Sequence, residues 1–191
     1  VGVAAADALA CGAAHVICVE PEQVLASRLG SLSDRYRNRI SVWPLALDIA
    51  EGMADLLLSE AHNQGHTMST TMTELFPNIF SGRAQRVRTT TIDVVEANKV
   101  ATVWKLDIEG MEANAIRGAR RTLECAPPRI ILAELYDPFV DEVVGLLPGY
   151  QVERAALTKS EYTLKLLPDI GGALPQEFCV TSPTYLFTKR E

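Results

Sequence analysis

The sequence has no long apolar run and no excess of basic charge. Its longest uncharged stretch near the N-terminus, residues 8–19, has 12 residues, whereas a helix needs roughly 18 to 20 to cross a bilayer. Lys and Arg together number 18 and Asp and Glu number 24, which gives a formal net charge of −6. Because nucleic-acid backbones and anionic membranes attract basic surfaces, this balance argues against either as the main partner. We therefore expect no membrane span and no nucleic-acid partner.

The sequence also lacks the short motifs that mark several enzyme classes. It contains no C-x-x-C pair, no H-E-x-x-H, no G-x-S-x-G and no Walker loop. These absences remove the usual zinc, hydrolase and P-loop interpretations. The three histidines show no metal-ligand spacing, so the residues alone predict no metal site.

What is present fits one globular domain that spans residues 1–191. Hydrophobic residues make up 48% of the chain, and a domain of this length can fill a core without disulfides or metal. The cysteines lie mostly in apolar surroundings, at Cys11, Cys18, Cys125 and Cys179. We interpret them as buried thiols of a cytoplasmic protein.

Short apolar runs alternate with amphipathic stretches along the chain. Predicted strands cover residues 15–19, 40–47, 53–59, 103–108 and 130–135, with extended residues at 87–93 and two further β segments at 150–157 and 184–188. Predicted helices cover residues 2–11, 21–32, 111–123 and 139–147. This alternation predicts an α/β fold with a mostly parallel sheet and a β-rich C-terminal part. Pro44 removes a ladder donor from the 40–47 strand, which places that strand at a sheet edge.

Acidic residues close three of the predicted strands. They are Glu20, Asp107 with Glu109, and Glu134. In open parallel sheets, ligands bind outside the carboxyl ends of the strands, so these acids are candidate ligand contacts. An acid that closes the second strand of a nucleotide-binding half bonds the ribose hydroxyls and follows the glycine-rich loop by about 20 residues. Counting back from Glu20 reaches the first residue, so we expect the glycine loop and the first strand to lie outside these 191 residues.

Residues 105–110, KLDIEG, place Lys105, Asp107 and Glu109 on one side of a strand exit. Charged residues repeated on a side that would otherwise be buried indicate a pocket, because burying unpaired charge costs several kcal/mol in order of magnitude. The alternative is an ion pair between Lys105 and Asp107, with Glu109 at a helix N-terminus. The polar segment 62–73 is long for an ordinary connection, and His66 within it is a candidate substrate contact.

Five segments in order resemble the FkbM-type S-adenosylmethionine-dependent methyltransferases. They are VICVEP, PLALDIAEG, VRTTTIDVV, WKLDIEGMEANAIRGARRTL and IILAELY. The most specific is KLDIEGMEANAIRGA, which is similar to the family's K-[IV]-D-[IV]-E-G-x-E stretch followed by R-G-A. The resemblance covers roughly residues 1–136 and implies a Rossmann-like class I methyltransferase fold, whose last two strands form an antiparallel hairpin.

The resemblance also implies a cofactor site for S-adenosylmethionine, with S-adenosylhomocysteine as the product. Glu20 would bind the ribose, and Ala46, Leu47 and Asp48 would border the adenine. Asp107 would lie beside the methionine moiety and the acceptor. Gly2 would be the tail of the family's D-x-G-A-N-x-G loop, the rest of which these residues do not contain.

The implied reaction is methyl transfer to a hydroxyl oxygen of a sugar, lipid-linked or polyketide-like small molecule. Asp107, Glu109 and His66 are the candidate general bases, and His66 and Glu134 are the candidate acceptor contacts. We expect Glu109, at a helix N-terminus, to favour its carboxylate and therefore to be the weaker base. Whether Asp107 and Glu109 hold a divalent ion stays open.

Two other functional classes stay open at this point. A catalytically silent Rossmann-like binding module would explain the missing glycine loop. A nicotinamide-dependent oxidoreductase would explain an acid that follows a strand. The oxidoreductase interpretation leaves KLDIEG unexplained, and the two last β segments favour the methyltransferase hairpin.

Overall fold

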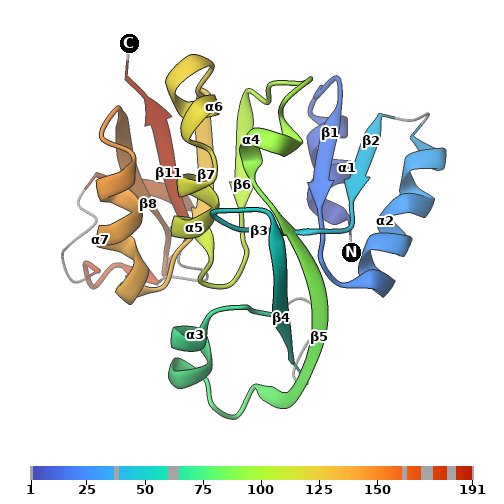
Figure 1. Ribbon diagram of the computed structural model, residues 1–191. Coiled ribbons are helices and arrows are strands. Elements are labelled where there is room, and N and C mark those ends of the chain that lie inside the picture. The colour runs from blue at the N-terminus through green and yellow to red at the C-terminus, as the bar shows by residue number, and fades with distance from the viewer. Residues whose placement is uncertain are drawn as a thin grey trace.

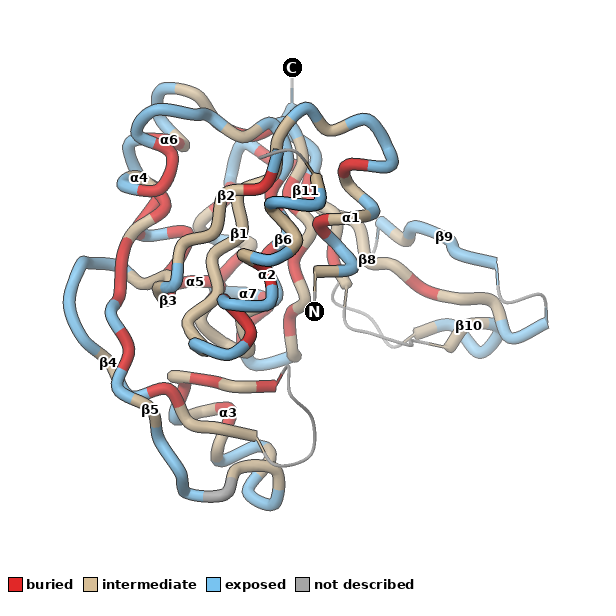
Figure 2. Tube along the Cα trace, turned by 90° about the vertical axis from the view of Figure 1, so that its right-hand side faces the viewer, coloured by how far each residue is buried: buried red, intermediate tan, exposed pale blue. Residues whose placement is uncertain are grey.

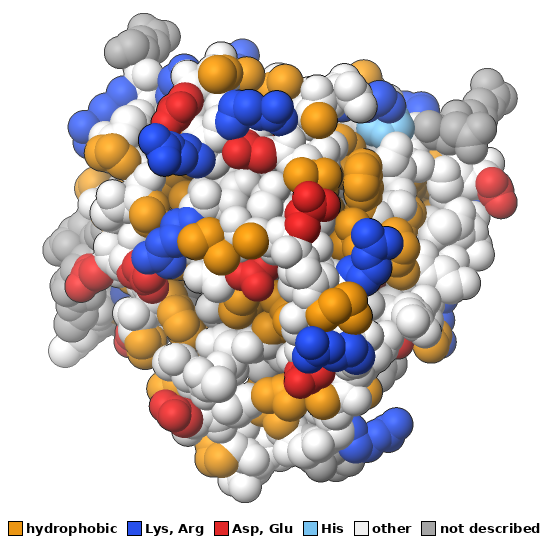
Figure 3. Space-filling view, in the orientation of Figure 1, with side chains coloured by type: hydrophobic (Ala, Val, Ile, Leu, Met, Phe, Trp, Pro, Cys, Tyr) orange, Lys and Arg blue, Asp and Glu red, His pale blue; other side chains and the backbone are white. Residues whose placement is uncertain are grey.

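The computed structural model describes residues 2–36, 39–59, 65–160, 163–168, 174–179 and 184–190. In these ranges the strands form sheets of two, three and six strands, and helices pack on them (Figure 1). None of the helices within these ranges is long and apolar enough to cross a membrane. Acidic and basic side chains are interspersed on the face seen in Figure 3, so the acidic excess is not gathered into one patch there.

The first unit of the fold is a small α/β layer at the start of the chain. It contains α1 (Val3–Ala10), β1 (Val16–Val19), α2 (Gln23–Arg35) and β2 (Ile40–Trp43). β1 and β2 pair in parallel, with Val16 opposite Ile40. Both carboxylate oxygens of Glu22 accept backbone N–H groups at the start of α2, as an N-cap does. The buried core cluster of this unit is small and consists of Ala5, Leu9 and Ile40, and Leu25, Ala26 and Leu29 of α2 are buried as well.

The middle of the chain, from β3 to α4, connects this layer to the second unit of the fold. It contains β3 (Ala46–Leu47), β4 (Gly52–Ser59), α3 (Thr70–Leu75), β5 (Phe80–Thr90) and α4 (Ile92–Val95). β4 and β5 pair antiparallel, and β3 pairs in parallel with β5. We call residues 48–90 the excursion. In Figure 1, α3 lies below α5 and the ends of β6 and β7, so the excursion reaches the carboxyl ends of those strands.

The second unit holds the larger sheet and the larger core. Its elements are β6 (Val103–Leu106), α5 (Glu112–Arg117), α6 (Arg120–Cys125), β7 (Ile130–Glu134), α7 (Asp137–Leu146), β8 (Tyr150–Thr158), β9 (Leu164–Leu167), β10 (Phe178–Cys179) and β11 (Thr184–Lys189). The strand order is β10-β8-β11-β7-β6, with β9 also paired to β8. β9 and β10 extend outward from the body of the molecule (Figure 2).

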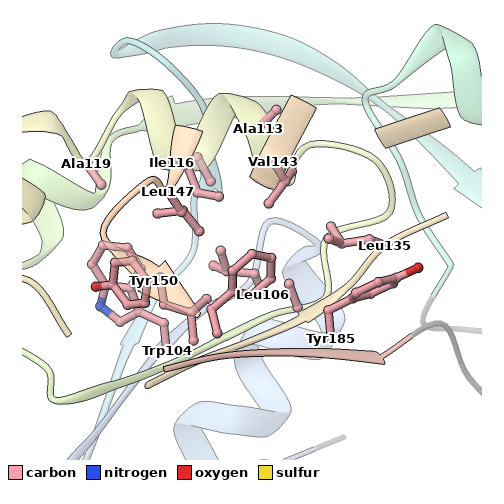
Figure 4. Close-up of a cluster of buried hydrophobic side chains, with 14 of the residues drawn as sticks. Trp104, Leu106, Ala113, Ile116, Ala119, Leu135, Val143, Leu147, Tyr150 and Tyr185 are labelled. Atoms are coloured by element: carbon pink, nitrogen blue, oxygen red, sulfur yellow. The ribbon is translucent and has the colours of Figure 1, made fainter. Parts of the chain in front are cut away.

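The core of the second unit lies between the sheet and helices α5 and α7 (Figure 4). Ile131, Val143 and Phe187 are at most 1% exposed. Two of the buried aromatic side chains have bonded polar ends: Tyr150 Oη donates to Pro128 O at 2.7 Å, and Trp104 Nε1 donates to Glu96 Oε1 at 2.6 Å. Large side chains with satisfied polar atoms are what a stable core requires.

The sheets are mixed, which corrects the expectation of a mostly parallel sheet. β6 and β7 pair in parallel, but β11 is antiparallel to both β7 and β8. The expected C-terminal antiparallel hairpin is confirmed by the pairing of β8 with β11. Among the described residues, β1 pairs only with β2, and β6 only with β7.

Three local predictions are wrong in detail. The strand predicted at 40–47 is split at Pro44 into β2 and β3, which belong to different sheets. Part of the predicted 62–73 loop is helix α3, and residues 62–64 of that loop lie outside the described residues. The single helix predicted at 111–123 is two short helices, α5 and α6, with Gly118 as the C-cap of α5; a Cβ at Gly118 would lie 2.3 Å from Asp48 O.

The cysteines also differ from expectation. All four are free, but Cys11 and Cys125 are exposed and the other two are only half-buried. The prediction of buried thiols was therefore wrong.

Candidate active site

The turn between β6 and α5 carries the central acid of the candidate site. Glu109 has φ 54°, in the left-handed region that residues other than glycine rarely adopt, and Gly110 follows with φ 90°. A Cβ at Gly110 would lie 2.6 Å from Met72 Cγ, so a side chain there would collide with the excursion. Strained backbone of this kind persists only where the surroundings enforce it, and it is concentrated at functional sites.

Glu112 holds this turn from the side of α5. Its side chain is 1% exposed, and its two carboxylate oxygens accept the N–H groups of Ile108 and Gly110, each at 3.0 Å. Burial raises the pKa of Glu112 to about 7, against the lowering effect of these bonds. Sequence reasoning missed this residue. The available signal was an acid at the first turn of a helix, which we had assigned to Glu109.

Thr67 holds the same turn from the excursion. Its hydroxyl donates to Glu109 O at 2.6 Å and accepts the N–H of Ser69 at 2.9 Å. Ser69 in turn caps α3, since its Oγ accepts the N–H of Met72. The first turn of α3 is thereby tied to the backbone of the candidate active site.

The structure gathers the three predicted acids Asp107, Glu109 and Glu134. The pKa of Glu109 is raised to about 7, first by burial and then by the negative charges of Asp107, Glu134 and Glu112. The expectation that Glu109 favours its carboxylate at a helix N-terminus was therefore wrong. α5 begins at Glu112, and Glu112 rather than Glu109 accepts the backbone N–H groups there.

The predicted ion pair between Lys105 and Asp107 is present. Both side chains are well exposed, at 52% and 38%, so this pair stabilises the fold little. Its effect is local, because it places one positive charge beside an otherwise acidic group of side chains.

Tyr136 is a second residue that sequence reasoning missed. Burial raises its pKa to about 12, and the charges of Glu109 and Glu134 add to the shift. The phenol therefore keeps its proton at neutral pH and can act as a hydrogen-bond donor. Its ring packs edge-on against Phe76 at the end of α3, with 5.3 Å between ring centroids. No pattern in the sequence links these two aromatic residues.

Glu20 lies directly after β1, as predicted, and is half-buried. Burial raises its pKa, although its Oε1 accepts the N–H of Glu22 at 2.9 Å. The carboxyl ends of β1, β6 and β7 face the same side of the molecule, the side on which α3 lies (Figure 1). Glu20 and the Glu109 group therefore lie on one face.

His66 lies on the excursion, and one of its ring nitrogens is occupied by the protein itself. Its Nδ1 accepts the N–H of Ser59 at 3.0 Å, which assigns the proton of the neutral ring to Nε2. Burial lowers its pKa, against the charge of Glu22. A neutral ring with Nδ1 occupied and a proton on Nε2 is a hydrogen-bond donor and not a general base. The charge effect of Glu22 also places His66 toward the start of α2.

The side chains of the residues expected around the adenine contact other parts of the protein. Asp48 Oδ1 accepts Asn114 Nδ2 at 2.9 Å and the N–H of Ile49 at 2.7 Å. The side chain of Ala46 is buried, and Leu47 packs against the larger core. These two residues therefore offer a ligand their backbone rather than their side chains.

Gly2 has a packing explanation of its own. It lies before α1 with φ 82°, and a Cβ there would lie 2.2 Å from Leu32 Cδ1. The glycine thus allows α1 to approach α2 closely, whether or not it also contacts a ligand.

Metal ligands do not mark the site among the residues that the structure describes. Within the described ranges, no group of three or more His, Cys, Asp and Glu side chains is arranged to hold a metal ion. A groove of about 310 Å³ lies elsewhere, between α2 and the end of β2. It is lined by Gln23, Ala26, Ser27, Val42 and Pro44 and contains none of the predicted site residues.

Comparison with known proteins gives two matches. The domain family described as "Methyltransferase FkbM domain" matches residues 3–157. The crystal structure of methyltransferase FkbM from Methylobacillus flagellatus KT is similar in fold, with a TM-score of 0.56 and 18% sequence identity. The match covers 98% of this chain but 40% of that one, so the chain spans less than half the length of that protein. No curated protein matches the chain.

Proposed function

Since the chain belongs to the methyltransferase FkbM family, we propose that it transfers a methyl group from S-adenosylmethionine to a hydroxyl oxygen of an uncharged small molecule or glycan. The observation that carries the proposal is the Glu109 carboxyl, with its pKa near 7 on a strained turn at the carboxyl end of β6. Such a group is a suitable general base at neutral pH.

The chain's own residues fit the cofactor in part. Glu20 offers a half-buried carboxylate at the end of β1, the position at which dinucleotide-binding sheets bond ribose hydroxyls. Ala46 and Leu47 offer backbone groups after Pro44, and Asp107 lies at the end of β6. The cofactor, when bound, supplies a methyl group on a positively charged sulfur. Glu20 would thus bind the cofactor's ribose, and Asp107 and Glu109 would lie where the methyl group is transferred.

Proton transfer is the chemical step assigned to Glu109. With the cofactor bound and its methyl group transferred to the acceptor oxygen, the Glu109 carboxylate would take up the proton that the acceptor hydroxyl loses. A positioned base contributes about 10²- to 10⁴-fold to a rate. With a pKa of about 7, Glu109 is partly ionised at neutral pH and basic enough to take the proton. Tyr136 and His66 would serve as donors that orient the acceptor.

The charge of the group restricts the acceptor. The charges of Asp107 and Glu134 raise the pKa of Glu109 and that of Tyr136, and Lys105 pairs with Asp107. Like charges at a binding surface are repelled, so an acceptor that carries phosphate or carboxylate near its hydroxyl is disfavoured. A neutral polyol or sugar hydroxyl fits this environment.

Calorimetry with S-adenosylhomocysteine tests the cofactor assignment. We expect the wild-type chain to bind it, and Glu20→Gln to weaken binding about tenfold, because a hydrogen bond to a charged group is worth about 1.5 to 3 kcal/mol. Glu124→Gln is the matched control, since Glu124 is exposed on α6 and pairs with Arg120. Absence of saturable binding by the wild type would contradict the proposed function.

A methyl-transfer assay with neutral hydroxyl acceptors tests the base. Glu109→Gln should keep the affinity for S-adenosylhomocysteine and lower kcat by about 10²-fold or more. If turnover on an accepted hydroxyl compound were unchanged in Glu109→Gln, the base would have to be another residue.

A further inference from the structure

The Glu109 turn is held by two elements that are far apart in the sequence. Glu109 and Gly110 both have positive φ angles, so the turn does not owe its shape to local preference. Glu112 fixes the N–H groups of Ile108 and Gly110 from α5. Thr67, 42 residues earlier than Glu109, fixes the Glu109 carbonyl oxygen from the excursion.

The hydrogen bonds from Glu112 and from Thr67 to the turn have opposite directions. Glu112 accepts hydrogen bonds from the turn, whereas the Thr67 hydroxyl donates one to it. Both side chains are 1% exposed, so water competes with neither contact. Gly110 leaves room for Met72 and Ser69 to close on the turn, since a Cβ there would collide with Met72 and make a tight contact of 3.1 Å with Ser69 Cβ.

We propose that Thr67 and Glu112 are positioning residues, which together keep the carboxyl of Glu109 in its half-buried place. The excursion thereby acts on the reacting group through the Thr67 hydroxyl, in addition to the packing of Met72 at Gly110. The importance of this for methyl transfer rests on the proposed function, but the positioning itself does not.

The carboxyl of Glu109 faces charged and titratable groups from every neighbouring element. β6 contributes Asp107, which Lys105 pairs, and β7 contributes Glu134. α5 contributes Glu112, and the segment before α7 contributes Tyr136. If the turn loosens, the Glu109 carboxyl moves away from these groups and toward water, and its titration returns toward that of an ordinary glutamate.

Carbon-13 NMR titration of glutamate side-chain carboxyls measures this directly. The Glu109 signal is assigned by its loss in Glu109→Gln, and in the wild type its midpoint should lie near 7. Thr67→Val removes the hydroxyl at nearly constant volume, and we expect it to lower the Glu109 midpoint by about one pH unit or more. Thr67→Ser keeps the hydroxyl and should restore the wild-type midpoint.

Two controls separate positioning from general loss of structure. Thr73→Val removes a hydroxyl that donates to Thr70 O within α3 and should leave the Glu109 midpoint unchanged. Glu142→Gln removes an exposed carboxyl that pairs with Arg117 and should also leave it unchanged. If Thr67→Val folds and its Glu109 carboxyl titrates with the same midpoint as in the wild type, the proposal is overturned.

Glu112→Gln keeps the test decisive if Thr67→Val does not fold. A glutamine has one carbonyl oxygen, so it loses one of the two bonds to the turn and also removes a neighbouring charge. Both effects should lower the Glu109 midpoint, and an unchanged midpoint would overturn the proposal.

Calorimetry with S-adenosylhomocysteine distinguishes the positioning proposal from the proposed function, because the calorimetry tests the cofactor site at Glu20 and the titration tests the Glu109 turn. A wild type that binds no S-adenosylhomocysteine defeats the proposed function and leaves the positioning result intact.

Discussion

The first unit, α1 to β2, and the second unit, β6 to β11, each end a strand with an acid but support it differently. Glu20 is bonded by the N–H of Glu22, two residues away. The backbone of the Glu109 turn is hydrogen-bonded by Glu112 of α5 and by Thr67, which lies on the excursion between β4 and α3. A local contact suits a group that meets a ligand, whereas a reacting group must be held before the ligand arrives.

The two units also differ in how deeply their strands are buried. Every residue of β1 is only half-buried, whereas Ile131 and Ala133 of β7 are at most 1% exposed. A parallel strand normally has both faces covered. The first unit is therefore the thinner of the two, and we expect it to open before the second unit does.

Matched leucine truncations should give the largest effect and test this difference. Leu147→Ala in the larger core should cost about 4 kcal/mol of unfolding free energy, and Leu9→Ala in the smaller core about 2 kcal/mol. Leu147 is 3% exposed within a crowded cluster, and Leu9 is 6% exposed beside few other buried residues. Denaturant titration measures both, and equal costs would remove the distinction between the cores.

Matched glycine substitutions come next in size. Gly110→Ala should cost about 2 to 4 kcal/mol, because positive φ strain adds to a collision with Met72. Gly12→Ala in the first unit should cost only about 1 kcal/mol, since its φ is 100° but no atom lies within 4 Å of the added Cβ. Thermal unfolding measures both, and similar costs would mean that the excursion does not press on the Glu109 turn.

Hydrogen exchange compares the units without any substitution. Amides of β1 should exchange at least about tenfold faster than those of β7, through opening of the first unit alone. The reason is the half-buried state of β1 and its pairing with β2 alone among the described strands. Mass spectrometry of exchanged peptides checks this, and equal protection would show that both units open together.

The smallest effect concerns pH. The folded pKa of Glu109, about 7, lies above its unfolded value, so its contribution to stability is present below about pH 4.3 and is lost as pH rises through 7. Glu109→Gln should therefore gain stability relative to the wild type between pH 4 and pH 8. Because the carboxyl is half exposed, the gain should stay below about 1 kcal/mol. Denaturant titrations at the two pH values measure it, and a constant difference would contradict the raised pKa.

Much of the local structure was predictable from the sequence. The apolar runs at 15–19, 103–108 and 130–135 correspond to β1, β6 and β7, and acids follow or close each strand as expected. The five family segments also gave the correct family, which the domain match over residues 3–157 confirms. These features depend on neighbours within a few positions, and periodicity reports such neighbours well.

The candidate site was predictable only in part. Asp107, Glu109 and Glu134 were expected at the same edge of the sheet, and the charges of Asp107 and Glu134 do act on Glu109. The base strength of Glu109 was predicted in the wrong direction, because the acid that bonds the turn's N–H groups is Glu112. His66 was a candidate base and a candidate acceptor contact; its Nδ1 accepts the N–H of Ser59, which leaves Nε2–H as a donor, and its role stays a prediction.

The sequence by itself determined where strands begin, which of them end in acids, and the family. The tertiary structure alone decided that β11 lies antiparallel between β7 and β8, and that Thr67 meets Glu109 across 42 residues. The physical reason is that strand pairing and buried hydrogen bonds join groups distant in the chain. Their energies depend on burial and geometry that no local pattern of residues records.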